Sequence, residues 1–292
     1  MNFLNALLYY LVIIPISLLP FPILYGLSNF IFFVFYYLIG YRKKVVFGNI
    51  QRSFPNKTAK EQEEICKKFY KHFCDLILES LKAFTISEKE VLKRVTCKNP
   101  EGINKYFDQG KSVIIAGGHY NNWEIFAVAV DKLIKHQVVG IYKPLTNKYF
   151  DEKMRITRGK YGLEMLSTKS VKQYLDKHIN DRTATIFAID QSPSNPNSAY
   201  WTTFLNQDTG VLFGTEKYAK DYNYPVVFGR INKEKRGYYS FEFFDVTDKP
   251  QETAYGEITE KITRMLETDI NKQPEYWLWS HRRWKHKRPQ GK

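Results

Sequence analysis

Residues 112–127 read SVIIAGGHYNNWEIFA, and this stretch decides the fold. Its apolar run, residues 113–116, predicts a short buried strand that two glycines interrupt, where we expect a sharp turn. His119 follows the glycines, and Asn121 or Asn122 can cap a new helix directly after it. The pattern therefore places an imidazole at the C-terminal edge of a sheet, which is where α/β folds hold their functional groups.

Glu124 lies five positions after His119, in the first turn of the expected helix. The intervening residues form the cap, so the chain can bring this carboxylate back to one ring nitrogen while the other nitrogen faces a cleft. This geometry predicts a general base oriented by Glu124. In the structural alternative, Glu124 only complements the helix dipole and His119 is a loop histidine whose hydrogen bonds are satisfied.

The His119-x4-Glu124 spacing after a Gly-Gly strand end resembles the H-x4-D/E motif of the glycerolipid and lysophospholipid acyltransferase superfamily. Within it, the chain is most similar to the bacterial lipid A biosynthesis (late) acyltransferases. Further similar stretches follow in that family's order over almost the whole chain: Tyr41 and Arg42, Asn49 to Pro55 (NIQRSFP), Tyr142 to Pro144 (YKP), Asp190 and Gln191, and Trp279 to Lys285 (WSHRRWK). One stretch departs from the family, because residues 201–206 (WTTFLN) lack its usual proline and final glycine.

The resemblance implies a membrane-bound O-acyltransferase of the bacterial inner membrane, with its catalytic domain on the cytoplasmic face. Such an enzyme moves a fatty acyl chain from acyl carrier protein, or from coenzyme A, to a hydroxyl of a lipid A precursor. It needs no metal and no redox cofactor. Two alternatives stay open: the acceptor is a lysophospholipid or an aminolipid, or the protein is a non-catalytic membrane scaffold.

The N-terminal 41 residues contain no charged side chain and are mostly Leu, Ile, Phe, Tyr and Val. Three prolines, at positions 15, 20 and 22, divide the segment, which predicts two helices of about 3–18 and 23–40, or one kinked span with an interfacial partner. The basic residues 42–44 follow at once and favour a cytoplasmic location for what comes next. We therefore expect a membrane anchor at 1–41 and an acyltransferase domain at 42–292.

The composition indicates a polyanionic partner, because the net charge of the 292 residues is +14. An anionic membrane, a phosphorylated lipid, an acidic carrier protein and a nucleic acid all satisfy this condition. The segment WLWSHRRWK at 277–285 alternates indoles with cations, which suits a membrane interface or stacking on single-stranded nucleic acid. The apolar N-terminus disfavours nucleic acid. Three cysteines without a C-x-x-C pair argue against a zinc site and a disulfide framework.

Helical and strand patterns alternate from residue 100 onward, which predicts an α/β fold with a mostly parallel mixed sheet flanked by helices. The late pair of strands is expected as an antiparallel edge. The predicted strands are Val95–Cys97, Ser112–Ala116, Gln137–Tyr142, Thr183–Ile189, Val226–Asn232 and Tyr238–Val246, and the predicted helices are Glu101–Asp108, Trp123–Ile134, Asn147–Lys160, Ser170–Ile179, Gly214–Tyr222 and Glu252–Asn271.

Two arginines, Arg155 and Arg158, stand nearly one turn apart in the expected helix 147–160. The resemblance places a functional arginine of the family in this region. A guanidinium there can stabilise the oxyanion of acyl transfer or hold a phosphate of the acceptor. We favour Arg158 as the catalytic group, because Gly159 leaves room for close approach, and Arg155 as a substrate-binding one. In the structural alternative, both are solvated surface arginines on a basic helix without a functional role.

Asp190 and Gln191 end the predicted strand 183–189 and give a second signal at the edge of the sheet. The resemblance implies that Asp190 orients the arginine or a substrate hydroxyl, and both residues are assigned to substrate binding. An Asx-type turn is the structural alternative. Lys143, just past the strand 137–142, lies at the same rim and can meet a phosphate, although most such lysines are only solvated.

Overall fold

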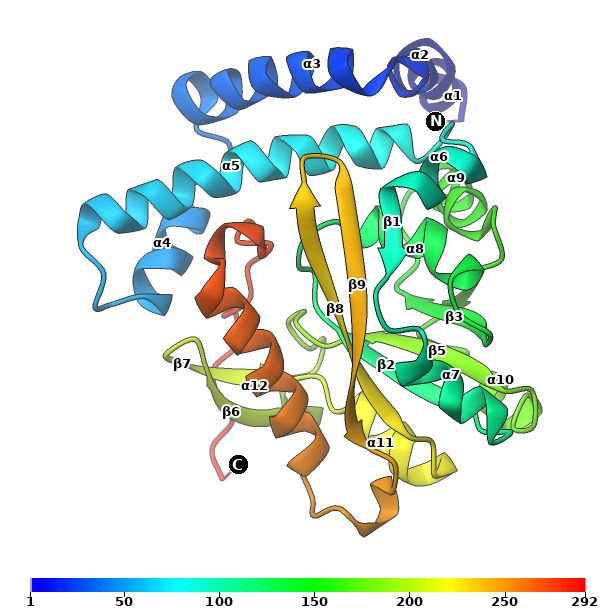
Figure 1. Cartoon of the computed structure of the whole chain (residues 1–292). Helices are drawn as coiled ribbons and strands as arrows, with labels where there is room; N and C mark the ends of the chain where they lie inside the picture. Colours follow the sequence, from blue (N-terminus) through cyan, green and yellow to red (C-terminus); the bar gives the residue numbers. More distant parts are fainter. Residues whose placement is uncertain (1, 292) are drawn as a thin grey trace.

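A seven-stranded sheet with the order β1-β9-β8-β2-β5-β3-β4 forms the centre of the computed structural model, which describes residues 2–291 (Figure 1). Its strands are β1 Val95–Cys97, β2 Val113–Gly117, β3 Gln137–Tyr142, β4 Glu164–Ser167, β5 Thr183–Ala188, β8 Val226–Lys235 and β9 Tyr238–Thr247. Every neighbouring pair is parallel except β8 and β9. The predicted mostly parallel mixed sheet is confirmed.

The antiparallel pair lies inside the sheet, so its predicted place at an edge is wrong. Strand β8 pairs with β2 on one side, and β9 pairs with β1 on the other. The three-residue strand β1 adds a parallel partner to β9 and becomes the edge itself. A separate hairpin of β6 (Tyr200–Phe204) and β7 (Gln207–Val211) stands outside the main sheet.

Helices cover both faces of the sheet because its strands carry apolar side chains on both sides. In β2, Ile114 and Ala116 join one buried cluster, and Val113 and Ile115 join the other. The first cluster includes side chains of α10 (Val171–Lys177), α11 (Gly214–Tyr222) and α12 (Glu257–Lys272); the second includes side chains of α6 (Glu88–Arg94), α7 (Glu101–Asp108) and α8 (Trp123–Ala129). Helix α9 (Lys148–Gly159) and four short 3₁₀ turns, at Val130–Lys132, Pro196–Ser198, Pro250–Glu252 and Pro274–Tyr276, complete this part.

Two apolar helical segments precede the sheet, close to the predicted bounds. The first runs through α1 (Asn2–Leu8), a π-helical turn (Tyr9–Ile13) and α2 (Ile14–Leu18), and the second through α3 (Phe21–Phe33) and a π-helical turn (Val34–Ile39). Among the described residues, only the second segment, Phe21–Ile39, is long and apolar enough to cross a membrane. The chain breaks between them because Pro20 adopts an extended conformation ahead of α3.

The second segment lies along α5 (Ala59–Lys82), the longest helix of the chain (Figure 1). The hydroxyl of Tyr25 donates to Glu79 at 2.8 Å, and that of Ser28 donates to the buried carboxylate of Asp75 at 2.7 Å. Helix α4 (Lys43–Ser53) joins the two, and a capping box formed by Thr58 and Glu61 starts α5. The apolar segment is therefore docked on the rest of the protein through polar contacts.

Candidate active site

The site forms where β2 and β5 end side by side. Gly117 pairs with Ala188 in the parallel ladder, so the residues two positions further along each strand, His119 and Asp190, meet at the same edge of the sheet. The Nδ1 atom of His119 lies 2.7 Å from Oδ1 of Asp190. The backbone N–H of His119 also donates to Oδ2 of Asp190 at 2.7 Å. Two residues 71 positions apart in the sequence thus form one pair.

The partner of His119 is not the predicted one. Glu124 accepts two hydrogen bonds from Arg158, from Nε at 2.9 Å and from Nη2 at 2.6 Å, and Asp190 takes the place at the imidazole. The side chain of Asn122 accepts from the N–H of Ile125 at 3.0 Å and thereby begins α8, so Glu124 belongs to the first turn of a formed helix. Its carboxylate meets the guanidinium from α9 as a bidentate ion pair, a geometry that a carboxylate prefers.

Trp123 connects the two pairs. Its ring packs edge-on against the imidazole of His119, with the centroids 5.0 Å apart, and its Nε1 donates to Glu124 at 3.1 Å. The Glu124–Arg158 pair is therefore a neighbour of the imidazole through an indole rather than through a direct hydrogen bond. The sequence does not point to Trp123, because a tryptophan in the first turn of a helix carries no signal of its own.

The two glycines serve close packing rather than a turn. A Cβ on Gly118 would stand 2.7 Å from a methyl carbon of Leu266, and one on Gly117 would stand 3.2 Å from the carbonyl oxygen of Gly229. The residue with a left-handed backbone is Asn121, with φ of +56°. The sharp turn lies at Asn121, three residues after the expected position, and the glycines let α12 and β8 approach the strand end.

Asp190 stays ionised at neutral pH. Burial raises the pKa of this carboxyl, but the charge and hydrogen bonds of His119, with a further hydrogen bond from Trp277, outweigh the burial and lower it to about 2. The Trp277 bond runs from Nε1 to Oδ2 over 2.8 Å. An ionised Asp190 accepts the proton on Nδ1 of His119, which leaves the lone pair on Nε2.

The pKa of His119 is raised. Burial lowers it, while the carboxylate of Asp190 stabilises the imidazolium and outweighs the burial. The side chain of His119 is 18% exposed, compared with 3% for Asp190, so the imidazole keeps an opening while its partner is sealed. A buried carboxylate behind a partly exposed imidazole is the arrangement expected for a histidine that acts as a general base.

A cavity of about 680 Å³ opens at His119. Four polar side chains of the predicted set line it: His119, Gln191, Lys143 and Arg158. The amide of Gln191 lies 3.2 Å from Nε2 of His119. The remainder of the lining is mostly apolar and comes from the sheet with its loops and from α8, α10 and α11, including Ile115, Phe126, Ala127, Leu163, Met165 and Ile186. The base thus stands at the polar end of an apolar chamber.

The two arginines of α9 have different places. The side chain of Arg158 is 22% exposed and lines the cavity beside Glu124, whereas Arg155 is exposed and lines an adjacent smaller pocket instead. Glu124 raises the pKa of Arg158 against the opposing effect of burial, so the guanidinium stays charged. Among residues 2–291, no group of three His, Cys, Asp or Glu side chains is placed to hold a metal ion.

In the segment 277–285, Trp277, Trp279 and Arg283 are buried and support the site from behind. Arg282 and Lys285 are exposed, so only part of the predicted belt of indoles and cations lies at a surface. Trp277 holds Asp190, and Asn49 of α4 donates to the carbonyl oxygens of Trp279 and His281 at 2.9 Å each. The family resemblance of this segment was a signal of function, but its composition alone pointed to a surface.

The fold and the site define a class of protein: an α/β protein in which a histidine paired with a buried carboxylate lines a largely apolar cavity. The chain belongs to the bacterial lipid A biosynthesis acyltransferase family, whose model matches residues 2–286, and it is an acyltransferase. It is 26% identical over 275 residues to a lipid A biosynthesis acyltransferase of Haemophilus influenzae, covering 91% of this chain and 86% of the relative.

Two relatives from Escherichia coli are similar over comparable lengths. A lipid A biosynthesis palmitoleoyltransferase is 21% identical over 282 residues, with 91% of this chain and 86% of the relative covered. A lipid A biosynthesis lauroyltransferase is 22% identical over 276 residues, with 94% and 88% covered.

Proposed function

We propose that this protein transfers a fatty acyl chain from an acyl thioester to a hydroxyl group of a lipid A precursor. The observation that carries the proposal is the His119–Asp190 pair, in which Asp190 holds Nδ1 and the imidazole lines a largely apolar cavity of about 680 Å³. The relatives from Escherichia coli are named for palmitoleoyl and lauroyl transfer in lipid A biosynthesis, and these names support the substrate class.

In the proposed reaction Nε2 of His119 takes the proton of the acceptor hydroxyl as the oxygen attacks the thioester carbonyl carbon. A hydroxyl does not ionise beforehand at neutral pH, so proton removal must accompany the attack. The tetrahedral oxyanion collapses, the carbon–sulfur bond breaks, and the imidazolium returns the proton to the leaving thiolate. The products are an ester and a free thiol. Asp190 holds the tautomer and stabilises the imidazolium, and it therefore positions the base.

Gln191 occupies the position that the acceptor hydroxyl needs. Its amide stands 3.2 Å from Nε2 of His119, at the mouth of the cavity. We infer that the arriving hydroxyl replaces this contact and that the amide then binds the substrate, in agreement with the substrate-binding role predicted for Gln191.

Arg158 is the group proposed to meet developing negative charge. Its Nε and Nη2 atoms are held by Glu124, and among residues 2–291 its Nη1 atom has no hydrogen-bond partner. A guanidinium fixed in this way is preorganised for the oxyanion or for an acceptor phosphate. Lys143 lines the same cavity and is exposed, so it is proposed as a further phosphate contact.

The acyl donor is proposed to be acyl carrier protein or coenzyme A, with its chain in the apolar part of the cavity. The location proposed is the cytoplasmic face of the bacterial inner membrane, where the apolar segments at residues 2–39 contact the lipid. Their exposed side chains support this, because Phe3 is 82% exposed, Leu11 is 64% exposed and Ile39 is 66% exposed. No metal or redox cofactor is required by the proposed steps.

The test is an assay of the purified full chain with labelled acyl carrier protein and acyl coenzyme A as donors. A phosphorylated glucosamine lipid with 3-hydroxyacyl chains, a lysophospholipid and an aminolipid serve as acceptors. We expect an acyloxyacyl product from the first acceptor only, and its loss by more than a hundredfold in His119→Ala. Exclusive acylation of lysophospholipid would overturn the lipid A assignment, and equal activity of His119→Ala would overturn the base.

A further inference from the structure

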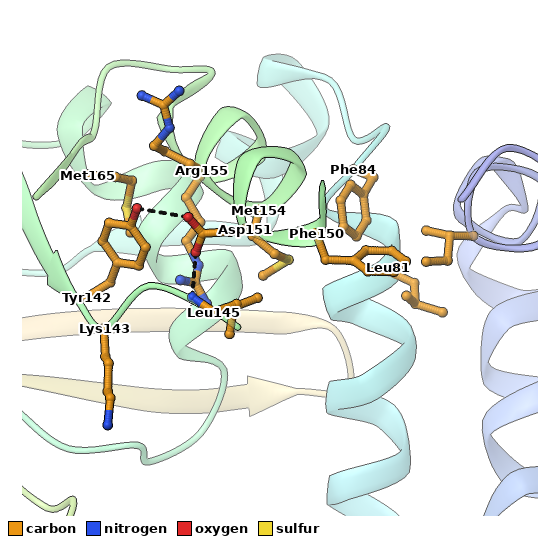
Figure 2. Close-up of a pocket in the computed structure, with 12 residues that line it drawn as sticks. Leu81, Phe84, Tyr142, Lys143, Leu145, Phe150, Asp151, Met154, Arg155 and Met165 are labelled. Carbon is orange, nitrogen blue, oxygen red and sulfur yellow. Dashed lines mark hydrogen bonds between the residues drawn. The ribbon is translucent and has the colours of Figure 1, made fainter. Parts of the chain in front are cut away.

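A second apolar pocket, of about 320 Å³, lies beside the active-site cavity (Figure 2). It is bounded by α5, by α9, by the end of β3 and by the first apolar segment. Figure 2 shows Leu81, Phe84 and Phe150 grouped on one side of it, and Tyr142 and Asp151 on the other. Its remaining lining residues are Ile13, Lys143, Leu145, Met154, Arg155, Arg158 and Met165.

The second pocket is continuous with the cavity that holds His119. Five residues line both spaces: Tyr142, Lys143, Leu145, Arg158 and Met165. Three of them come from the end of β3 and the loop after it. The backbone N–H of Leu145 donates to Asp151 of α9 at 2.7 Å, which holds that loop in place. The two spaces therefore meet at the positively charged end of the active site.

The outer wall of the second pocket is the first apolar segment. Tyr9 packs edge-on against Phe84 and Tyr149, with ring centroids 5.5 Å and 6.0 Å apart, and Ile13 lines the pocket itself. The same segment exposes apolar side chains on its outside, including Leu4 at 70% and Tyr10 at 57%. A hydrocarbon chain in this pocket would thus lie next to the most apolar surface of the protein.

We propose that the second pocket binds a hydrocarbon chain of the acceptor lipid, while the acyl chain of the donor fills the larger cavity; this rests on the proposed function. The product joins two hydrocarbon chains at one ester, so two apolar spaces must diverge from the point of bond formation. The larger cavity is lined by the sheet, α8, α10 and α11 and by none of residues 2–39, and it suits a chain delivered by a water-soluble carrier. The smaller pocket lies against that segment and suits a chain that arrives from a bilayer.

The experiment fills the second pocket from Met154, which lines it and does not line the larger cavity. In Met154→Trp we expect kcat/KM for an acceptor with a full-length 3-hydroxyacyl chain to fall at least tenfold, through KM of the acceptor. For an acceptor truncated to 3-hydroxybutyryl the fall should be less than threefold. A fall of equal size for both acceptors, or a shift in donor chain preference instead, would overturn the assignment.

Ala127→Leu is the matched control, because Ala127 lines only the larger cavity. We expect this variant to prefer shorter donor chains than the wild type and to keep the wild-type ratio of full-length to truncated acceptor. If Ala127→Leu changes the acceptor ratio and Met154→Trp changes the donor preference, the two spaces have the opposite occupants.

A crosslinking readout separates this inference from the reaction itself. In this experiment benzoylphenylalanine replaces Phe84 in the His119→Ala variant of the full chain. The protein is irradiated in phosphatidylglycerol vesicles with one of two ligands, either the phosphorylated 3-hydroxyacyl glucosamine lipid or acyl carrier protein that carries a saturated acyl thioester. We expect crosslinks to the glucosamine lipid to exceed those to the thioester chain at least fivefold. When benzoylphenylalanine instead replaces Lys217, an exposed residue of α11, we expect no crosslink to either lipid. If the wild type binds the glucosamine lipid but does not acylate it, the proposed function alone is wrong. If the thioester chain is crosslinked preferentially, this inference is wrong.

Discussion

The hydrogen bond between Nδ1 of His119 and Oδ1 of Asp190 sets both the orientation and the basicity of the imidazole. Replacing Asp190 with asparagine removes the charge that raises the pKa of His119, while burial still lowers it. We expect kcat/KM of Asp190→Asn to fall at least a hundredfold, since the tautomer is no longer held. The measurement is the steady-state rate of acyl transfer.

The dependence of kcat/KM on pH tests whether Asp190 raises the pKa of His119. A base acts when neutral, so wild-type kcat/KM should rise with pH through a pKa above 6.5, the ordinary value of histidine. In Asp190→Asn this limb should move to lower pH. The matched control is Asp181→Asn, because Asp181 contacts His178 in an exposed pair at 2.6 Å away from the site. An unmoved limb in Asp190→Asn would contradict the assignment.

Arg158 offers a second test at the scale of one residue. Lysine keeps the charge but cannot form the bidentate pair with Glu124, so we expect Arg158→Lys to lose at least tenfold in kcat/KM. A fall in kcat assigns the guanidinium to the oxyanion, and a rise in KM of the acceptor assigns it to a phosphate. Arg288→Lys is the control, since Arg288 forms an exposed ion pair with Asp208. Equal effects of the two substitutions would refute a role for Arg158.

The sequence identified the groups of the site better than it paired them. A glycine-terminated strand followed by a helix cap placed His119 at the sheet edge, and the same kind of signal selected Asp190 and Gln191. The pairing depends on β2 and β5 being neighbours, and strand order is not written in local periodicity. Local spacing therefore favoured Glu124, which is close in sequence, over a carboxylate 71 positions away.

At the scale of elements, long periodic segments were predicted within a few residues, and short or polar ones were missed. Strand β4 has only four residues at the sheet edge. The β6–β7 hairpin turns through Leu205 and Asn206, whose φ angles of +50° and +61° are both left-handed. Turns of this kind usually contain glycine, and a leucine in this position gives no turn signal.

The site depends on the N-terminal cap of α8. Loss of this cap should lower the free energy of unfolding by more than the loss of an ordinary helix cap does. Asn122 accepts from Ile125 and also donates to Glu79 at 2.6 Å, and Glu79 is 1% exposed with a pKa raised by burial. We expect Asn122→Ala to lower the free energy of unfolding by about 2–4 kcal/mol, because a cap is lost and a buried acid loses a donor.

Thr58→Ala removes the cap of α5 on the exposed side of the protein and is the matched control. We expect it to cost about 1 kcal/mol with unchanged acyl transfer. Denaturation of the detergent-solubilised protein, followed by circular dichroism, compares the two. Equal losses would mean that the bond to Glu79 adds nothing.

At the scale of the whole molecule, the apolar segments and the catalytic part form one body. Helix α3 lies along α5, which carries lysines and glutamates over its whole length, from Lys60 to Lys82. A bilayer-spanning α3 in this docked position would take those charges into the hydrocarbon core, which is costly. For the proposed membrane-bound protein, the arrangement thus favours segments that lie in the membrane plane with their exposed apolar sides in the lipid, rather than helices that span it.

This arrangement predicts the topology of the break between the two segments. In a spanning hairpin, Leu19 would reach the periplasmic side, whereas in-plane segments keep it on the cytoplasmic side, where its carbonyl oxygen accepts from Lys82 at 3.0 Å. We expect Leu19→Cys to escape an impermeant maleimide added to right-side-out vesicles, and Lys217→Cys to react only in inverted vesicles. Labelling of Leu19→Cys from the periplasmic side would show that the segments leave α5 and cross the bilayer. In that case the outer wall of the second pocket would exist only while the segments are docked on the rest of the protein, and in the membrane the acceptor chain would need another route to His119.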